Sequence, residues 1–392
     1  MKPLARRTDE LRQSDIRAVS QMVSAVDGIN LGQGICDLPT PPALRSAAIE
    51  AVHAGHATYS HYAGIEPLRK YIYDKAREYN GIPVTSPDEI VVGVGSTGAF
   101  ATTILALLNP GDEVILFEPF YGYHVNLVRA VGGAPVSVSQ TLPDWDVDFD
   151  EVEDAVTDRT KAIVVTTPGN PNGKVWKRTE LEQLLSIAIR HDLWIITDEI
   201  YEYIVYDEHV HLSAASLPGA YERTITISGF SKTFNMTGWR LGYAVAPSVV
   251  AEKVGLLSDL FYICAPTPLQ HGVAAANGMT EDYFNEMRVD YARKRYLMCR
   301  TLEEAGFVVH WPQGAYYVLA DVTPLAERMR GFENDRAACK TLIDTCGIGS
   351  VSGSSFFTNK IVGSRYLRFC FAKEMDELEI ACSRLREAFA VT

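Results

Sequence analysis

The amino-acid sequence predicts an α/β protein with a mainly parallel sheet covered by helices on both faces, and a smaller α+β domain towards the C-terminus. Three observations support this prediction. The chain has 392 residues, which is enough for two domains. Its middle part alternates apolar, strand-like runs with helical patterns, and such alternation is typical of parallel sheets. Its C-terminal part instead begins with a long, charged helical pattern and contains only short strand-like runs.

The expected strands of the large sheet are apolar runs that end at turn residues. They comprise residues 90–94, 113–117, 162–166, 194–197, 224–228 and 240–245. Among the segments between them, residues 179–191 have the periodicity of a helix. Thr179 and Glu182 have the spacing of a capping box, so we expect this helix to begin there.

The smaller domain is predicted from the C-terminal elements. A charged helix is expected over residues 282–305, short strands over 316–320 and 366–371, and a closing helix over 374–389. The N-terminal segment is expected to return to this domain. We therefore predict a large domain over residues 48–285 and a small domain formed by residues 1–47 and 286–392.

Composition and charge limit the classes of function. The chain is 47% hydrophobic and 22% charged, as ordinary globular proteins are. Its formal net charge of −13 argues against a general nucleic-acid or anionic-membrane surface. The 7 cysteines form no CxxC pair, no apolar run reaches the roughly 18 residues of a membrane helix, and the N-terminus has no apolar signal core. We therefore expect a soluble, cytoplasmic protein with reduced thiols and no zinc site.

Chemically suggestive side chains follow four of the expected strands. Residues 95–98 (Gly-Ser-Thr-Gly) follow the first, Asn170 follows another, Asp198 and Tyr201 follow a third, and Lys232 follows a fourth. Ligands bind beyond the carboxyl ends of the strands in such sheets. The sequence therefore predicts a binding site at this edge.

The glycine-rich segment at residues 92–98 contains G-x-G-x-x-G between a strand and a helix. Glu118 lies about 20 residues further on, where a dinucleotide fold keeps its ribose-binding acid. Taken alone, this pattern is compatible with an NAD-dependent oxidoreductase, with a phosphate bound at a helix N-terminus, or with a tight turn that binds nothing. The aromatic loop at residues 119–121 instead suits stacking on a ring. The oxidoreductase interpretation also leaves Lys232 without a role.

Lys232 is the main candidate for catalysis, because it is a single lysine among small, neutral and apolar residues. A desolvated lysine has a lowered pKa and can act as a nucleophilic amine. Asp198 is expected at the end of a buried strand, where it could pair with a protonated pyridine nitrogen or cap a helix over residues 199–203. Tyr201 and Asn170 are donors suited to a phenolate oxygen, and a buried tyrosine and an Asn-Pro turn are their structural alternatives.

Residues 229–242 read GFSKTFNMTGWRLG and match the pattern G-F-S-K-x-x-N-M-x-G-x-R-L-G. This stretch resembles the cofactor-lysine signature of the class I and II aminotransferases, which are fold-type I pyridoxal-phosphate enzymes. Other motifs follow in the family's order along most of the chain: LGQG at 31–34, Tyr59, Gly64, PLR at 67–69, GSTG at 95–98, NPGD at 109–112, PFY at 119–121, NPNG at 170–173, DEIY at 198–201, PQGAY at 312–316 and LRF at 367–369. The chain looks most similar to the kynurenine and neutral-amino-acid branch. The resemblance implies a seven-stranded, mainly parallel sheet and the cofactor pyridoxal 5′-phosphate.

The resemblance also implies how the cofactor ring is held. Lys232 would carry it as an internal aldimine and later move the proton between the substrate and the cofactor. Asp198 would pair with the pyridine nitrogen, while Tyr201 and Asn170 would bind the ring oxygen. Tyr121 would stack on the face of the ring.

The cofactor phosphate is expected to contact Arg240 and the loop residues Gly95, Ser96 and Thr97. Family members build this site at a dimer interface, so Tyr59 is expected to reach the phosphate of the neighbouring subunit in a homodimer. One position departs from the family pattern, because Gly229 stands where many relatives have a serine that touches the phosphate. At the substrate end, Arg368 is expected to bind the α-carboxylate, assisted by Asn170 and the Gly34 backbone.

The identity of the amino acid is read from residues 254–287, which contain no lysine or arginine. Relatives that prefer dicarboxylic substrates often lend a second arginine from this region to the partner's site. A buried carboxylate without a cationic partner is costly. We therefore expect a neutral, sulfur-containing or aromatic L-amino acid, with 2-oxoglutarate or pyruvate as the 2-oxo acid. Carbon–sulfur β-lyases, aminocyclopropane-carboxylate synthases and a non-catalytic ligand sensor stay open as alternatives.

Overall fold

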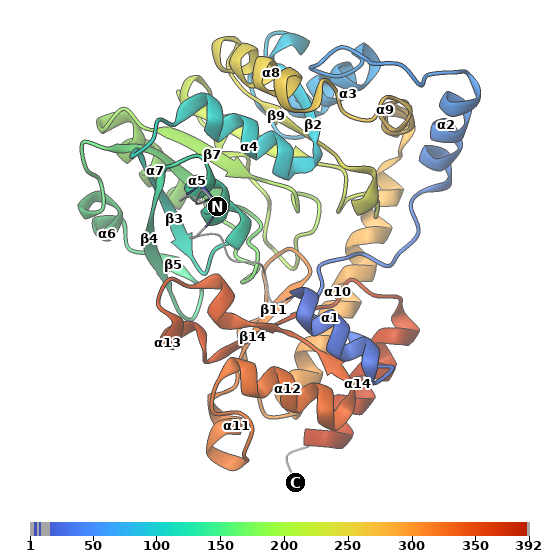
Figure 1. The fold of residues 1–392 in the computed structure, drawn as a ribbon, viewed down its shortest axis with the longest axis vertical. Helices are drawn as coiled ribbons and strands as arrows, with labels where there is room; N and C mark the ends of the chain where they lie inside the picture. The colour runs from blue at the N-terminus through green and yellow to red at the C-terminus, as the bar shows by residue number, and fades with distance from the viewer. Residues whose placement is uncertain (1–3, 6–7, 9–15, 390–392) are drawn as a thin grey trace.

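A computed structural model describes residues 4–5, 8 and 16–389 of the chain. Its ribbon has an upper part around a large sheet and a lower part around a smaller sheet, which the long helix α10 (Glu281–Glu304) spans (Figure 1). Two predictions concern the N-terminal residues: that they contain no apolar signal core, and that residues 1–47 belong to the small domain. Most of residues 1–15 lie outside the described ranges.

The large sheet has eight strands. Their order is β2 (Ile90–Val94), β9 (Leu241–Val245), β8 (Thr224–Gly229), β7 (Trp194–Asp198), β6 (Thr160–Thr166), β3 (Glu113–Glu118), β4 (Ala134–Thr141) and β5 (Asp146–Val147). Five of them, from β8 to β4, pair in parallel, whereas β9 is antiparallel to both of its neighbours and β5 is antiparallel to β4. The predicted mainly parallel sheet is therefore confirmed, and the two-residue strand β5 extends it beyond the expected seven strands.

The register aligns the carboxyl ends of the central strands. Thr166 at the end of β6 pairs with Asp198 at the end of β7, and Asp198 pairs with Ile227 near the end of β8. Asp198 is thus the last residue of its strand and not the first residue of the following loop. Residues 200–203 form turns and no helix follows Asp198 in this described part of the chain, so the alternative in which Asp198 caps a helix over 199–203 is wrong.

Helices cover both faces of this sheet because alternate strand residues point to opposite sides. One face packs against α4 (Gly95–Leu107), α5 (Gly122–Ala130) and α8 (Ser248–Tyr262), with Phe100 and Val254 beside Ile196 and Ile225. The other face packs against α6 (Phe149–Asp154) and α7 (Arg178–Arg190). Further helices, α2 (Pro42–His53), α3 (Glu66–Glu78) and α9 (Thr267–Ala274), lie beyond β2 and β9 (Figure 1).

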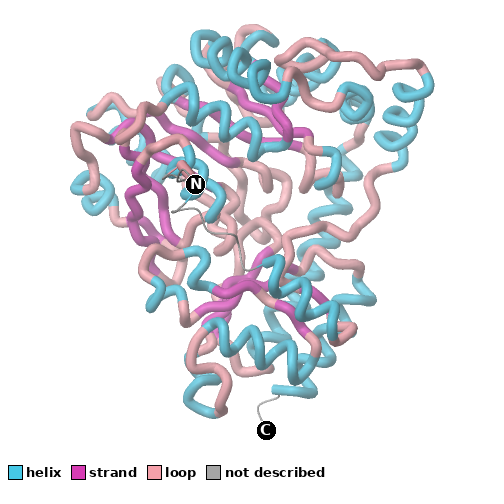
Figure 2. The backbone as a smooth tube through the Cα atoms, viewed as in Figure 1, coloured by secondary structure: helices cyan, strands magenta, loops and turns pink. Residues whose placement is uncertain are grey.

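The smaller sheet is antiparallel, in the order β10 (Val308–Val309), β11 (Tyr317–Asp321), β14 (Tyr366–Cys370) and β13 (Val351–Ser352). The helices α11 (Thr323–Arg328), α12 (Asp335–Cys346), α13 (Lys360–Gly363) and α14 (Met375–Phe389) surround it (Figure 2). The N-terminal helix α1 (Ile16–Ala25) also lies here, and β1 (Ile29–Asn30) pairs in parallel with β12 (Ile348–Gly349). The predicted domain boundaries at residues 47/48 and 285/286 stay a prediction.

Two local expectations differ from the structure. Helix α7 begins at Arg178, because the Glu180 carboxylate accepts a hydrogen bond of 2.7 Å from the backbone N–H of Lys177; the predicted cap pair Thr179 and Glu182 is wrong. The last strand of the large sheet begins at Leu241, since Arg240 has a left-handed backbone with φ of 55° and cannot continue a strand.

Strand β4 was not expected from the sequence. Its side chains alternate valine with serine, and most of them are partly exposed because only the short strand β5 lies beyond it in the sheet. No helix of the described residues is long and apolar enough to cross a membrane.

Candidate active site

A cavity of about 550 Å³ lies at the carboxyl edge of the large sheet, where residues of both sheets meet. The predicted site residues that line it are Gly34, Ser96, Tyr121, Asn170, Asp198, Tyr201, Lys232 and Arg368. The other lining residues, which the sequence did not single out, are Ser20, Gln33, Ile35, Tyr123, Thr166, Ile200 and Tyr317. Residues that are up to several hundred positions apart in the sequence therefore share one cavity.

Lys232 lies in the turn that follows β8 and points into this cavity. Its Nζ donates a hydrogen bond of 3.1 Å to the backbone oxygen of Gly34 and lies 5.9 Å and 5.7 Å from the ring centroids of Tyr201 and Tyr316. Burial lowers the pKa of Lys232 from 10.5 to about 8. The amine is thus half neutral near pH 8, and the neutral form is the one that can act as a nucleophile or a base.

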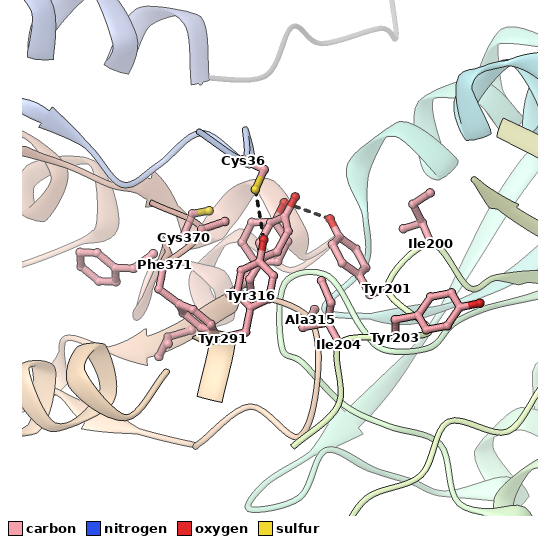
Figure 3. Packing of buried hydrophobic residues seen from close by; sticks show 14 of the residues in the cluster. Cys36, Ile200, Tyr201, Tyr203, Ile204, Tyr291, Ala315, Tyr316, Cys370 and Phe371 are labelled. Atoms are coloured by element: carbon pink, nitrogen blue, oxygen red, sulfur yellow. Dashed lines mark hydrogen bonds between the residues drawn. The ribbon is translucent and has the colours of Figure 1, made fainter. Parts of the chain in front are cut away.

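Aromatic rings pack beside Lys232, and Figure 3 shows how Tyr201, Tyr316 and Tyr291 lie within this cluster. Tyr201 and Tyr316 meet edge to face with centroids 5.1 Å apart, and Tyr316 stacks on Tyr291 at 5.7 Å. The Cys36 thiol lies 3.1 Å from the hydroxyl of Tyr291. Burial raises the pKa of Tyr201 and Tyr316 well above 10, so both phenols keep their protons and can donate hydrogen bonds.

Asp198 is buried at the floor of the cavity. Its Oδ2 lies 3.1 Å from Nε2 of His124, and its Oδ1 accepts a hydrogen bond of 3.3 Å from the backbone N–H of Ile200. His124 is on α5, where it stacks on Phe100 and meets the edge of Tyr121. No local pattern of the sequence predicted His124, because its contact with Asp198 depends on how α5 packs on the sheet. A carboxylate held this way is a suitable partner for a cationic ring nitrogen.

A buried ionic network holds the turn that follows Asp198 and contains Tyr201. Lys75 binds Glu202 at 2.7 Å, and Glu199 lies 3.0 Å from Nε2 of His211. Glu199, Glu202 and His211 are close enough together to ligate a metal ion, but both oxygens of Glu202 already accept hydrogen bonds, from Lys75, Asn80 and Ser228. The network is therefore better explained as support for the turn.

Arg368 enters the cavity from β14 of the smaller sheet. Its Nη1 donates to Asn170 Oδ1 at 2.9 Å and its Nη2 donates to the Gly32 backbone oxygen at 2.7 Å. Its buried Nε has no hydrogen-bond partner among the described residues. A buried guanidinium without a carboxylate is costly, so this arrangement suits a ligand anion. Asn170 precedes Pro171 in a turn and also lines the cavity. Its interpretation as a turn residue is therefore compatible with its interpretation as a donor to a ligand oxygen.

A second anion-binding arrangement lies at the N-terminus of α4. Gly95 has a φ of +71°, and a Cβ on it would lie 2.5 Å from Nη2 of Arg240. Arg240 also donates to the Thr237 backbone oxygen at 2.9 Å. Ser96 lines the cavity, and Thr97 follows it in the first turn of α4. The Gly95 N–H donates to the Arg240 backbone oxygen at 2.9 Å. The other first-turn N–H groups of α4, the two hydroxyls and the guanidinium together suit a phosphate.

Two residues that the sequence analysis considered, Tyr59 and Glu118, do not line the cavity. Tyr59 does not line the cavity of this chain, and it is 77% exposed. Glu118, which a dinucleotide site would direct at a ribose, is buried and accepts a hydrogen bond of 2.6 Å from the Thr358 backbone N–H. Glu118 thus anchors a loop, which removes the support it gave to the oxidoreductase interpretation.

Comparisons with known proteins agree with this geometry. The family described as "Aminotransferase class I and II" matches residues 26–385. The aspartate aminotransferase of Pyrococcus abyssi is 34% identical over 97% of both chains, and human kynurenine–oxoglutarate transaminase 1 is 32% identical over 98% of this chain and 97% of the other. The solved structure of N-succinyldiaminopimelate aminotransferase from Mycobacterium tuberculosis superimposes with a TM-score of 0.93 at 33% identity, and the match covers 98% of this chain and 100% of that one.

Proposed function

The chain belongs to the class I and II aminotransferases, and we propose that it moves an amino group between a neutral, sulfur-containing or aromatic L-amino acid and a 2-oxo acid. Enzymes of this family depend on pyridoxal phosphate. The identities to relatives named for aspartate and for kynurenine are nearly equal, at 34% and 32%. The choice of side chain therefore has to be argued from the cavity.

The cavity has the groups that pyridoxal phosphate requires. Asp198 offers a buried carboxylate for the ring nitrogen, and Lys232 offers an amine that burial keeps partly neutral. Gly95 leaves the space beside Arg240 that a side chain would fill. When bound, the cofactor supplies an electron-withdrawing ring that accepts the negative charge developing at the substrate α-carbon.

We assign the predicted residues to the following roles. Lys232 binds the cofactor covalently, Asp198 faces its ring nitrogen, Tyr201 and Asn170 face its ring oxygen, and Tyr121 packs on its ring. The phosphate is assigned to Gly95, Ser96, Thr97 and Arg240. These assignments are supported by the shared cavity and by the anion-binding arrangement at the start of α4.

In the reaction, the residues of the chain bind the substrate and move its proton. Arg368 and Asn170 fix the α-carboxylate, which places the α-carbon near Lys232. Lys232 would be released as a free amine when the substrate amino group takes its place on the cofactor, and its neutral Nζ would then remove the proton from the α-carbon and hold it as an ammonium group. A pKa of about 8 suits this task, because a general base works best when its pKa is near the ambient pH.

One observation carries the proposed side-chain preference: the only cations among the described lining residues are Lys232 and Arg368. Lys232 is assigned to the cofactor, and Arg368 is assigned to the α-carboxylate of the substrate. The remaining lining residues include Ile35, Tyr123 and Ile200, which suit an apolar side chain.

The cysteines of the chain are free thiols, which supports a reducing, cytoplasmic location as part of the proposal.

The substrate preference predicts the outcome of an amino-acid panel. With 2-oxoglutarate as acceptor, kcat/KM for phenylalanine, methionine or kynurenine should exceed that for aspartate at least about tenfold, because a second carboxylate would be desolvated without a cation. Steady-state assays of amino-group exchange measure this. A preference for aspartate would disprove the substrate class, and release of pyruvate and ammonia from a β-substituted substrate would establish a lyase instead.

The pKa of Lys232 predicts a pH dependence. The rate at which the protein without cofactor takes up pyridoxal phosphate should rise with pH and reach half its maximum near pH 8, not near 10.5. The sign follows from burial, which favours the neutral, nucleophilic amine at lower pH. Stopped-flow absorbance measures the rate, and Nα-acetyllysine serves as the matched control for the titration of the aldehyde. A profile that coincides with that of acetyllysine would contradict the buried amine.

We also propose a homodimer, and the exposed apolar residues predict where its subunits meet. Leu260 near the end of α8 is 75% exposed and Tyr59 is 77% exposed. The backbone oxygen of Thr58, which precedes Tyr59, accepts a hydrogen bond of 2.9 Å from Thr267. Leu260→Asp should lower the molar mass in light scattering from dimer towards monomer and weaken pyridoxal phosphate binding, because Tyr59 would no longer reach a neighbouring site. Val210→Asp is the matched control, since Val210 is 77% exposed elsewhere. A wild-type monomer would refute the assignment of Tyr59.

A further inference from the structure

Tyr317 touches both halves of the cavity, although the roles assigned so far do not use it. It is the first residue of β11, and it is 2% exposed. Its hydroxyl lies 3.0 Å from the hydroxyl of Tyr201, and the Cζ atom of Arg368 lies 4.3 Å from its ring centroid. A Cβ on Gly34 would lie 1.9 Å from its hydroxyl, so the chain leaves room for this phenol only because residue 34 is glycine.

Which of the two phenols donates their shared hydrogen bond is determined once Tyr201 binds the cofactor. Each phenol has one proton to donate, and its oxygen can also accept. When Tyr201 donates its proton to the ring oxygen of the cofactor, its own oxygen is left to accept from Tyr317. A hydroxyl that accepts a hydrogen bond is a stronger donor, because neighbouring hydrogen bonds polarise one another.

Both phenols keep their protons in this environment. Burial raises the pKa of Tyr317 to about 12 and that of Tyr201 well above 10. The other titratable groups that face this pair are Tyr121, Lys232, Tyr316, Arg368 and Cys370. The cationic Arg368 partly offsets the effect of burial on both.

We propose that Tyr317 is a positioning residue that acts on the two ends of the site through different parts of one side chain. Its hydroxyl donates to Tyr201 and strengthens the hydrogen bond that Tyr201 gives to the cofactor ring oxygen. Its ring packs against the guanidinium of Arg368 and holds it in the orientation that receives the α-carboxylate. This inference rests on the proposed function, because it assigns the ring oxygen to Tyr201 and the carboxylate to Arg368.

The hydroxyl is tested by the pH titration of the visible absorbance of the loaded enzyme without substrate. The titrating proton is shared between the Lys232 nitrogen and the cofactor ring oxygen, so a weaker donor to that oxygen makes the proton harder to remove. Tyr317→Phe should raise the titration midpoint by about half a pH unit to one unit. Tyr201→Phe should raise it further, and the double variant should show no additional shift over Tyr201→Phe.

The ring is tested by the affinity of the loaded enzyme for 3-phenylpropionate, a carboxylate that has no amino group to react. Tyr317→Phe keeps the ring and should leave the dissociation constant within about twofold of the wild-type value. Tyr317→Leu removes the ring and should raise it about threefold to thirtyfold. Tyr206→Phe is the matched control, because it removes a buried phenol that donates to the Ala315 backbone oxygen outside the cavity, and it should change neither readout.

The outcomes separate this inference from the proposed function. If the wild-type protein loaded with pyridoxal phosphate has no visible band, the proposed function and this inference both fail. If the wild type titrates normally and Tyr317→Phe has the same midpoint, Tyr317 does not act on Tyr201 and the inference alone is overturned. Additive shifts in the double variant overturn it as well, because they show that the hydroxyl does not act through Tyr201.

Discussion

Replacing Lys232 with alanine is expected to abolish transamination and the Schiff-base absorbance band at about 420 nm that the wild type forms with pyridoxal phosphate. Lys232 contributes the single amine of the cavity, and no other described lysine lines it. The variant loses the covalent attachment of the cofactor and the base that moves the α-proton. A positioned general acid–base group alone contributes up to about 10⁴-fold, so we expect kcat to fall by at least that factor.

Lys232→Arg separates the chemistry of the amine from its charge. Arginine keeps a cation near the Gly34 backbone oxygen but cannot lose a proton in this pH range, so it is neither a nucleophile nor a base. It should be as inactive as the alanine variant. Borohydride reduction of the loaded wild type, followed by peptide mass spectrometry, should place the pyridoxyl group on Lys232. Modification of another lysine, or normal turnover by either variant, would remove Lys232 from its assigned role.

The Lys232 region shows how much of the site the sequence could predict. The motif at residues 229–242 placed Lys232 and Arg240, and the strand pattern placed Asp198 at a buried strand end. These predictions need only local information, since a strand end and the turn after it fix where such residues emerge. The eight predicted residues that line the cavity come from motifs of this kind.

Residues that act through partners far away in the sequence could not be predicted in this way. Tyr317 meets Tyr201 across 116 positions, and neither the strand pattern around Tyr317 nor its residue type indicates that contact. His124 faces Asp198 only because α5 packs on the sheet in the required register. Strand β4 is a different case, since its alternating valines and serines are a local strand pattern that the sequence did contain. Long-range packing is thus the information that the sequence patterns lacked for Tyr317 and His124.

Arg368→Ala is expected to reduce kcat/KM for every amino acid by a factor between about 30 and about 4000. Removing one partner of a buried, hydrogen-bonded charge pair costs about 2–5 kcal/mol, and about 1.4 kcal/mol corresponds to a factor of ten. Arg368 is 2% exposed and already donates to Asn170 and to the Gly32 backbone, so its unpartnered Nε lies on a guanidinium that cannot turn away. The loss should appear mainly in KM, because the α-carboxylate is common to all substrates and is bound before the reaction.

Arg368→Lys is the control that distinguishes geometry from charge. Lysine keeps the positive charge but presents a point donor in place of a planar fork, so it cannot hold Asn170 and a carboxylate together. We expect it to recover only part of the lost kcat/KM, and to do so equally for phenylalanine, methionine and aspartate. Both variants should still show the visible band of the loaded enzyme, since Arg368 is assigned to the substrate and Lys232 to the covalent attachment of the cofactor. If Arg368→Ala bound amino acids as tightly as the wild type, the α-carboxylate would have to bind elsewhere. Lys232 would then be the remaining cation among the described lining residues. The roles assigned to Arg368 and Lys232 would therefore have to be revised together.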